Sequence, residues 1–193
     1  MDALTLLPSQ TALFIVDVQE KLVPAMHAPD AKRMVACVEL LVEAAQRFRM
    51  PVLVTEHYPQ GLGRTLPSIV ALFESFDAKP LVVEKTIFSA MGPAEVPRAL
   101  AATGARSVIA VGVEAHVCLF QTARELARRG YHTHVPFDAV ASRDPACKAA
   151  ALALLGQHGV SVTTTETAVF DLLGDAKHEH FKALSKRIKT LVG

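Results

Sequence analysis

The chain has 193 residues, 51% of them hydrophobic, and its 20 basic residues nearly balance its 19 acidic residues, for a formal net charge of +1. This length suits a single domain over residues 1–193 that buries a core without disulfides or a metal, and the hydrophobic content excludes a disordered protein. The balanced charge, with no run of like charges, argues against nucleic acid or an anionic membrane as the main partner.

The first half of the chain contains strand-like apolar segments and one long helical pattern. Five consecutive apolar residues predict a strand over 12–16. Over 31–49, apolar residues recur at steps of three and four, which indicates one buried helix face. Further strands are predicted over 52–54 and 81–83. The segment 56–68 between them is the main irregular stretch, and we expect it to form a lid or a pocket wall.

The second half continues this alternation of strands and helices. It is predicted to contain a strand over 107–111, a helix that ends near Gly130, a strand over 131–135, a helix from Pro145 to about Gln157 with Asp144 as its cap, a strand over 160–162 and an amphipathic helix over 181–191. Because strands rich in valine and isoleucine alternate with helices, we expect an α/β fold with a doubly wound, parallel, six-stranded sheet and helices on both faces, which is a Rossmann-like arrangement.

Polar residues that end apolar segments are candidate site residues, since ligands of such sheets bind at the carboxyl ends of the strands. Asp17 follows the first strand, and Lys85 follows the third. Residues 112–118 lead from the fourth strand into a helix that starts near Cys118. A carboxylate can take the proton of a thiol, and an ammonium can stabilise the resulting thiolate. The three residues together therefore predict nucleophilic catalysis.

Each of these residues also has an ordinary structural interpretation. At a helix start, free amides and the helix dipole favour a thiolate at Cys118 and could hold an oxyanion, but cysteine is also a common small buried residue. Asp17 could cap a helix, and Lys85 could be a solvated lysine. Cys147 lies in a comparable first helical turn without an evident polar partner, whereas Cys37 is expected to be a core thiol.

Three segments resemble motifs of the isochorismatase-like cysteine hydrolases, in the order and at the spacing of that family. They are FIVDVQ at residues 14–19, EKTIFS at 84–89 and GVEAHVC at 112–118. Two further segments, TEHYP at 55–59 and LLGDA at 172–176, are most similar to the branch called isochorismatase domain-containing proteins.

The resemblance implies a hydrolase without a cofactor, in which Cys118 is the nucleophile, Asp17 is the general base and Lys85 lies beside both. It also implies a cis peptide bond between Val113 and Glu114, which turns the N–H groups of Glu114 and Cys118 toward the substrate oxygen. The implied reaction is attack of the thiolate on a small amide or related carbonyl substrate. Water then hydrolyses the resulting thioester.

The residues expected to contact this small-molecule substrate are Gln19, Tyr58, Phe88 and Phe120. Metal-dependent nicotinamidases of the family carry an Asp-x-His element after the second strand, where this chain has Glu56 and His57. We therefore expect no bound metal, and we expect His57 to be a pocket or surface residue.

Three other functions compete with a hydrolase. A dinucleotide-binding module would need G-x-G-x-x-G after the first strand, where the chain has DVQEK at residues 17–21. A family member could instead bind a metabolite or a protein partner without turnover, or Cys118 could serve as a redox thiol. Three well-separated cysteines suit a reducing compartment, so we expect a cytoplasmic location. The family resemblance further implies a homo-oligomer, a dimer or larger.

Overall fold

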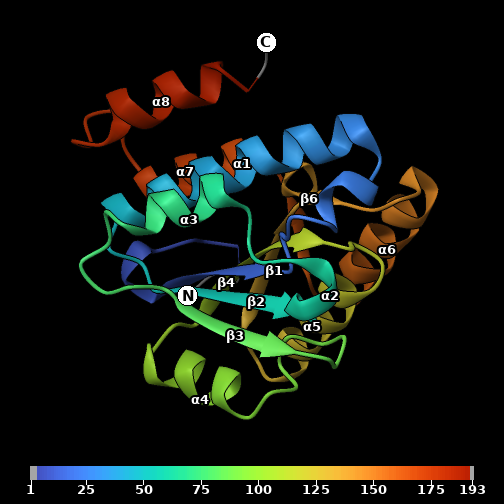
Figure 1. Ribbon diagram of the computed structural model, residues 1–193. Helices are drawn as coiled ribbons and strands as arrows, with labels where there is room; N and C mark the ends of the chain where they lie inside the picture. The colour runs from blue at the N-terminus through green and yellow to red at the C-terminus, as the bar shows by residue number, and fades with distance from the viewer. Residues whose placement is uncertain (1–3, 192–193) are drawn as a thin grey trace.

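Seven parallel strands form one sheet in the part of the chain that the computed structural model describes, residues 4–191 (Figure 1). In chain order they are β1 (Thr11–Val16), β2 (Val52–His57), β3 (Leu81–Lys85), β4 (Ser107–Val113), β5 (His132–Pro136), β6 (Val140–Ala141) and β7 (Ser161–Thr163). Side by side they follow the order β3-β2-β1-β4-β5-β7, and the short β6 pairs with β4. Every pair is parallel. This is the order of a doubly wound sheet, so the predicted fold class is confirmed.

Helices cover both faces of the sheet. The α-helices in the described range are α1 (Ala28–Arg47), α2 (Pro59–Leu62), α3 (Pro67–Phe73), α4 (Glu95–Ala102), α5 (Cys118–Arg128), α6 (Pro145–Gln157), α7 (Thr165–Leu173) and α8 (Phe181–Lys189). Short 3-10 helices occur at η1 (Pro8–Gln10), η2 (Val23–Ala25) and η3 (Phe137–Ala139). Figure 1 shows α1, α3, α7 and α8 on one side of the sheet and α4, α5 and α6 on the other.

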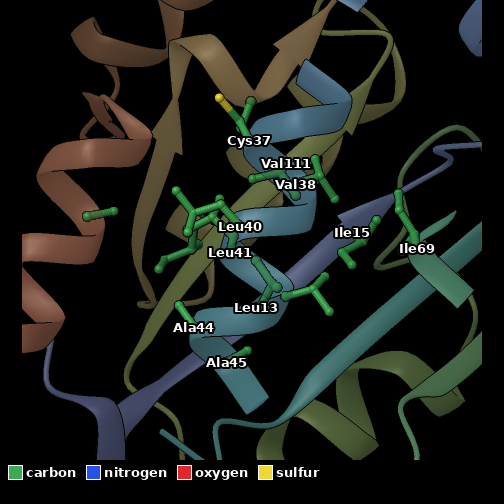
Figure 2. Packing of buried hydrophobic residues seen from close by; sticks show 14 of the residues in the cluster. Leu13, Ile15, Cys37, Val38, Leu40, Leu41, Ala44, Ala45, Ile69 and Val111 are labelled. Carbon is green, nitrogen blue, oxygen red and sulfur yellow. The ribbon is translucent and has the colours of Figure 1, made fainter. Parts of the chain in front are cut away.

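Alternate residues of β1 point to the two helical layers. Leu13 and Ile15 belong to the apolar cluster that includes α1, whereas Phe14 and Val16 belong to the cluster that includes α5. Figure 2 shows the buried face of α1 close to Leu13 and Ile15. Every residue of β1 is buried, because both faces of the strand are covered. This explains why a continuous apolar run, rather than an alternating one, marks the strand in the sequence.

The structure departs from the predicted elements in several places. β2 continues to His57, and the segment 56–68, expected to be irregular, contains α2 and the start of α3. Helices α3, α4 and α7 and strand β6 are absent from the predicted elements, because segments this short do not establish a clear apolar period. The predicted cap at Asp144 is confirmed, since its side chain accepts a hydrogen bond from the N–H of Ala146.

The direction in which the chain adds strands reverses between β1 and β4. From β1 the chain proceeds through β2 to the edge strand β3, and β4 then returns to the opposite side of β1. The carboxyl ends of β1 and β4 therefore flank the place where doubly wound sheets bind ligands. Asp17 directly follows β1, and Cys118 follows β4 after residues 114–117.

Gly112 allows β4 to approach β1 closely at this place. Its φ is +116°, and it pairs with Val16, the last residue of β1. A Cβ atom at residue 112 would overlap the backbone carbonyl of Val16. Any side chain there would push the two strands apart next to Asp17.

We expect Gly112→Ala to lower the free energy of unfolding by about 3 kcal/mol or more, because left-handed strain and overlap with β1 act together. The control is Gly104→Ala, since Gly104 also has a positive φ, +71°, but an added Cβ meets no atom within 4 Å. The control should lose about 1–2 kcal/mol. Urea denaturation followed by circular dichroism measures both. Equal losses would show that the close approach of β4 to β1 is not needed.

Candidate active site

Asp17 is a fully buried carboxylate at the end of β1. Its φ of 55° lies in the left-handed region, where the chain turns out of the strand. Oδ1 accepts a hydrogen bond from the Thr55 hydroxyl at 2.8 Å, and Oδ2 accepts one from Lys85 Nζ at 2.6 Å. Burial raises the pKa of Asp17, while the Lys85 ammonium acts in the opposite direction. The carboxylate is therefore a stronger proton acceptor than an exposed aspartate.

Lys85 ends β3, and its side chain reaches past β2 to the residue that follows β1. The side chain is fully buried. Besides Asp17, Nζ donates to the Phe88 carbonyl oxygen at 3.1 Å and lies 3.4 Å from His57 Nδ1. Three N–H groups thus have three partners, as a buried charge requires. The alternative of a solvated lysine is wrong.

Cys118 is the first residue of α5, and only 6% of its surface is exposed. Burial and then the Asp17 carboxylate raise the pKa of its thiol to about 12, although Lys85 acts in the opposite direction. Burial and the neighbouring carboxylate thus oppose the effect expected of the helix start, whose contribution to the state of the thiol stays a prediction. At neutral pH the thiol keeps its proton, and Sγ lies within 4.8 Å of an Asp17 oxygen that can accept it.

The connection between β4 and α5 presents backbone N–H groups near Cys118. The Val113–Glu114 peptide bond is cis, at the position that the family resemblance implies. The N–H of Ala115 donates to a carbonyl of β6, whereas the N–H groups of Glu114 and Cys118 have no acceptor in the described part of the chain. The Glu114 side chain is held by Arg143, with Nε 2.9 Å from Oε2. Two N–H groups are thus available for a substrate oxygen.

His57 belongs to the same cluster, although the sequence predicts only that it lies in a pocket or on the surface. One of its ring nitrogens lies within 4.8 Å of both an Asp17 oxygen and Cys118 Sγ. The ring stacks on Phe88 with centroids 5.6 Å apart. Burial and then the charge of Lys85 lower the pKa of His57, so its imidazole is neutral at pH 7. The register of β2 against β3 is the signal that could have identified His57, because it pairs His57 with Lys85.

The Gln19 side chain forms its hydrogen bonds with backbone groups of the protein. It is fully buried, and Nε2 donates to the carbonyl oxygens of His57 at 3.0 Å and Gly63 at 2.7 Å. Oε1 accepts a hydrogen bond from the N–H of His57 at 2.7 Å. These contacts fix the backbone at the end of β2 and so hold His57 in place. Direct contact between Gln19 and a substrate stays a prediction.

Of the three aromatic residues expected near the substrate, Tyr58 and Phe120 line two different hollows, and Phe88 contacts His57. Tyr58 and Lys85 line one hollow, of about 390 Å³, and Phe88 is stacked on His57 of the site cluster. Phe120 lines a smaller hollow, of about 140 Å³, on the outer part of α5 and α6. The structure thus brings Phe88 to the cluster, whereas substrate contacts of Tyr58 and Phe120 stay predictions.

Among the described residues, one group of side chains is placed so that it could hold a metal ion: Asp17, His57 and Cys118. Their candidate ligand atoms all lie within 4.8 Å of one another, and oxygen, nitrogen and sulfur donors suit zinc. Lys85 Nζ, however, contacts both Asp17 Oδ2 and His57 Nδ1. An ion would have to displace this positive charge, so a metal-free site stays our prediction.

Comparison with known proteins identifies relatives over most of the chain. The family model of the isochorismatase domain matches residues 11–167. Isochorismatase domain-containing protein 2 of Bos taurus is 37% identical over 183 residues, which are 95% of this chain and 85% of the relative. Isochorismatase domain-containing protein 1 of Salmo salar is 37% identical over 186 residues, which are 95% of this chain and 62% of the relative.

Solved structures show the same relationship. The structure of MAR1 ribonuclease from Caenorhabditis elegans has a TM-score of 0.86 and 34% identity, and the match covers 96% of this chain and 92% of that chain. The YcaC gene product of Escherichia coli, described as an octameric hydrolase of unknown specificity, has a TM-score of 0.84 and 22% identity, with 99% of each chain covered. The second likeness is one of fold alone.

We expect Asp17→Asn to accelerate alkylation of Cys118 by iodoacetamide at pH 8. The change removes a charge that disfavours the thiolate and leaves Lys85, so the pKa of the thiol falls. The rate should rise about tenfold for each unit of that fall, because the thiolate is the reacting form. Site-resolved mass spectrometry measures the rate, and Cys147, which lies outside the cluster, is the internal control. A Cys118 rate at or below that of the wild type would contradict the assigned electrostatics.

Proposed function

The chain belongs to the isochorismatase family, and from this premise we propose that it is a hydrolase that cleaves a small amide or related carbonyl substrate with Cys118 as nucleophile. The observation that carries the proposal is the convergence of the Asp17 carboxylate, the Lys85 ammonium and the Cys118 thiol at one edge of the sheet. A base, a cation and a nucleophile in one buried site are the groups that covalent catalysis needs.

In the first half of the proposed reaction, Asp17 accepts the thiol proton and the Cys118 sulfur attacks the substrate carbonyl carbon. The Lys85 ammonium stabilises the negative charge on sulfur, and the N–H groups of Glu114 and Cys118 donate to the oxyanion of the tetrahedral intermediate. When the intermediate collapses, the leaving nitrogen takes the proton from Asp17. The acyl group remains on the sulfur as a thioester.

In the second half, Asp17 accepts a proton from the water molecule that attacks the thioester. The carbon–sulfur bond then breaks, a carboxylic acid leaves, and the proton on Asp17 returns to the sulfur. Because burial raises the pKa of Asp17, this carboxyl group accepts a proton more readily than an exposed aspartate does in both halves. We propose that the cycle uses no metal and no organic cofactor.

A second candidate function is RNA cleavage, since the Caenorhabditis elegans relative carries the name ribonuclease. Arg64 contacts the carboxylates of Glu56 and Glu84, and Arg143 contacts that of Glu114. These guanidinium groups are already paired, so they do not offer a free positive charge to a phosphate. We therefore favour a small-molecule substrate over nucleic acid.

We further propose a cytoplasmic location. In residues 4–191, no helix has the length and the apolar character needed to cross a membrane. All three cysteines are free thiols. Unpaired thiols suit a reducing compartment.

We expect the wild type to release ammonia or amine from members of a panel of small amides, and Cys118→Ala to release none above background. Intact-mass spectrometry of rapidly quenched reactions should show an acyl group on Cys118. Asp17→Asn should lower kcat about 10²–10⁴-fold, because the general base is lost. Cys147→Ala is the matched control, since it removes a thiol outside the cluster, and it should keep full activity.

Three outcomes would contradict the proposed function. Amide hydrolysis that survives Cys118→Ala would exclude the nucleophile, and tight binding of a metabolite without turnover would favour the non-catalytic alternative. RNA cleavage without amide hydrolysis would favour the second candidate. Chelation should leave the activity unchanged, so bound zinc at one ion per chain with activity lost on its removal would contradict the metal-free mechanism.

We also expect a homo-oligomer, a dimer or larger. Apolar side chains are exposed on the edge strand β3 and after it, with 46% of Val82 and 56% of Ile87 accessible. A second copy that covers them would remove this surface from water. Light scattering should give a mass above the 20.7 kDa of one chain, and Val82→Lys should shift it toward that value. Val70→Lys, on α3, is the control. One 20.7 kDa species of the wild type at micromolar concentration would contradict the proposal.

A further inference from the structure

The contacts of Lys85 determine which nitrogen of His57 carries the proton. An ammonium group has three N–H donors and no acceptor. Nζ contacts Asp17 Oδ2 at 2.6 Å, the Phe88 carbonyl oxygen at 3.1 Å and His57 Nδ1 at 3.4 Å. In the last contact Nδ1 must be the acceptor, because Lys85 can only donate. In a neutral imidazole the single proton is then on Nε2.

The ring of His57 is held in one place by contacts on several sides. Gln19 bonds to its backbone N–H and to its carbonyl oxygen. The Phe88 ring stacks on it with an interplanar angle of 26°. The residue is only half-buried, so part of the ring stays accessible to a ligand. Within the described chain Nε2 donates to no acceptor, and His57 therefore presents a fixed N–H group beside the cluster.

We propose that the Nε2–H group of His57 orients the substrate by donating to a hydrogen-bond acceptor on the carbon atom next to the carbonyl that Cys118 attacks. The inference rests on the proposed hydrolysis and narrows its substrate class. One ring nitrogen of His57 lies within 4.8 Å of Cys118 Sγ, so an acyl group bonded to that sulfur lies beside the ring. The fitting substrates are small amides that carry a second oxygen or nitrogen acceptor at this position.

The charges around the cluster indicate that this acceptor is uncharged. The charges of Asp17 and Lys85 cancel within one ion pair. The ion group of Arg64, Glu56 and Glu84 lies on the opposite face of β2 and β3, because successive strand residues alternate between faces, so Arg64 supplies no cation to the cluster. A substrate carboxylate would lose its hydration without gaining an unpaired cation in the described surroundings.

Three amides of similar size distinguish the effect of the acceptor from the effect of substrate shape. Methoxyacetamide carries a neutral ether oxygen on the carbon next to the carbonyl, butyramide carries a methylene group there, and malonamate carries a carboxylate. The measured quantity is the ratio of kcat/KM for methoxyacetamide to that for butyramide. The inductive effect of the ether oxygen acts alike in every variant, so a change in this ratio reports the hydrogen bond.

Two substitutions of His57 test the roles of its two ring nitrogens separately. His57→Asn keeps an acceptor for Lys85 near the place of Nδ1 but removes the distal donor, and the ratio should fall about tenfold, the worth of one hydrogen bond. His57→Gln places an amide N–H near the position of Nε2, and the ratio should stay within about twofold of the wild type. A merely structural role would slow both substrates alike and leave the ratio unchanged in both variants.

The outcomes distinguish this inference from the proposed function. An unchanged ratio in His57→Asn, with activity still lost in Cys118→Ala, would overturn the donor role and leave the hydrolase standing. Activity in Cys118→Ala would overturn the hydrolase mechanism. A higher kcat/KM for malonamate than for methoxyacetamide would overturn the uncharged acceptor.

The tautomer itself is measured independently of turnover. A long-range ¹H–¹⁵N correlation spectrum of histidine-labelled protein at pH 7, with the signals of His57 assigned through their loss in His57→Asn, should show a protonated Nε2 and an unprotonated Nδ1. A ring protonated on Nδ1 would overturn the inference, whether or not any amide of the set is hydrolysed.

Discussion

A lysine and an aspartate, both fully buried, meet at 2.6 Å between the ends of β3 and β1. Removing two charges from water costs several kcal/mol for each ion, and the cost is offset only when every remaining donor and acceptor finds a partner. Here the partners come from the intervening strand, through Thr55 and His57, and from the backbone of Phe88. Removing either charge would leave the other unpaired, at about 3–5 kcal/mol. The ion pair therefore forms only when these three neighbouring strands keep their register, and it lies at the ends where the candidate site is.

The same pair sets the state of the thiol. Asp17 is close enough to raise the pKa of Cys118, and Lys85 is close enough to lower it, but burial adds to the effect of Asp17. The thiol is consequently protonated at neutral pH, with its proton acceptor next to it. In the proposed reaction this nucleophile needs the substrate to complete its activation, because proton loss from the thiol becomes favourable only when negative charge can move onto the substrate oxygen, where the N–H groups stabilise it.

The sequence predicted six of the seven strands and three residues of the candidate site, for a physical reason. Strands covered on both faces are continuous apolar runs, and Asp17 and Lys85 interrupt such runs at strand ends, where parallel sheets bind ligands. His57 gives no such signal, because its place in the cluster depends on the pairing of β2 with β3. The sequence also could not predict the protonation of Cys118. The helix dipole, the carboxylate and burial change the pKa of the thiol in different directions, and the size of each effect depends on distances.

The buried and protonated thiol has a consequence for inhibitor chemistry. Simple electrophiles react with a thiolate, and this thiol, with a pKa of about 12, offers little of it at neutral pH. An aldehyde or nitrile placed where the scissile carbonyl binds would instead develop negative charge that the N–H groups of Glu114 and Cys118 can receive, and Asp17 would take the proton of the thiol, as in the proposed reaction. Reversible warheads that imitate the carbonyl should therefore discriminate this cysteine from more reactive thiols elsewhere, whereas general alkylating agents should not.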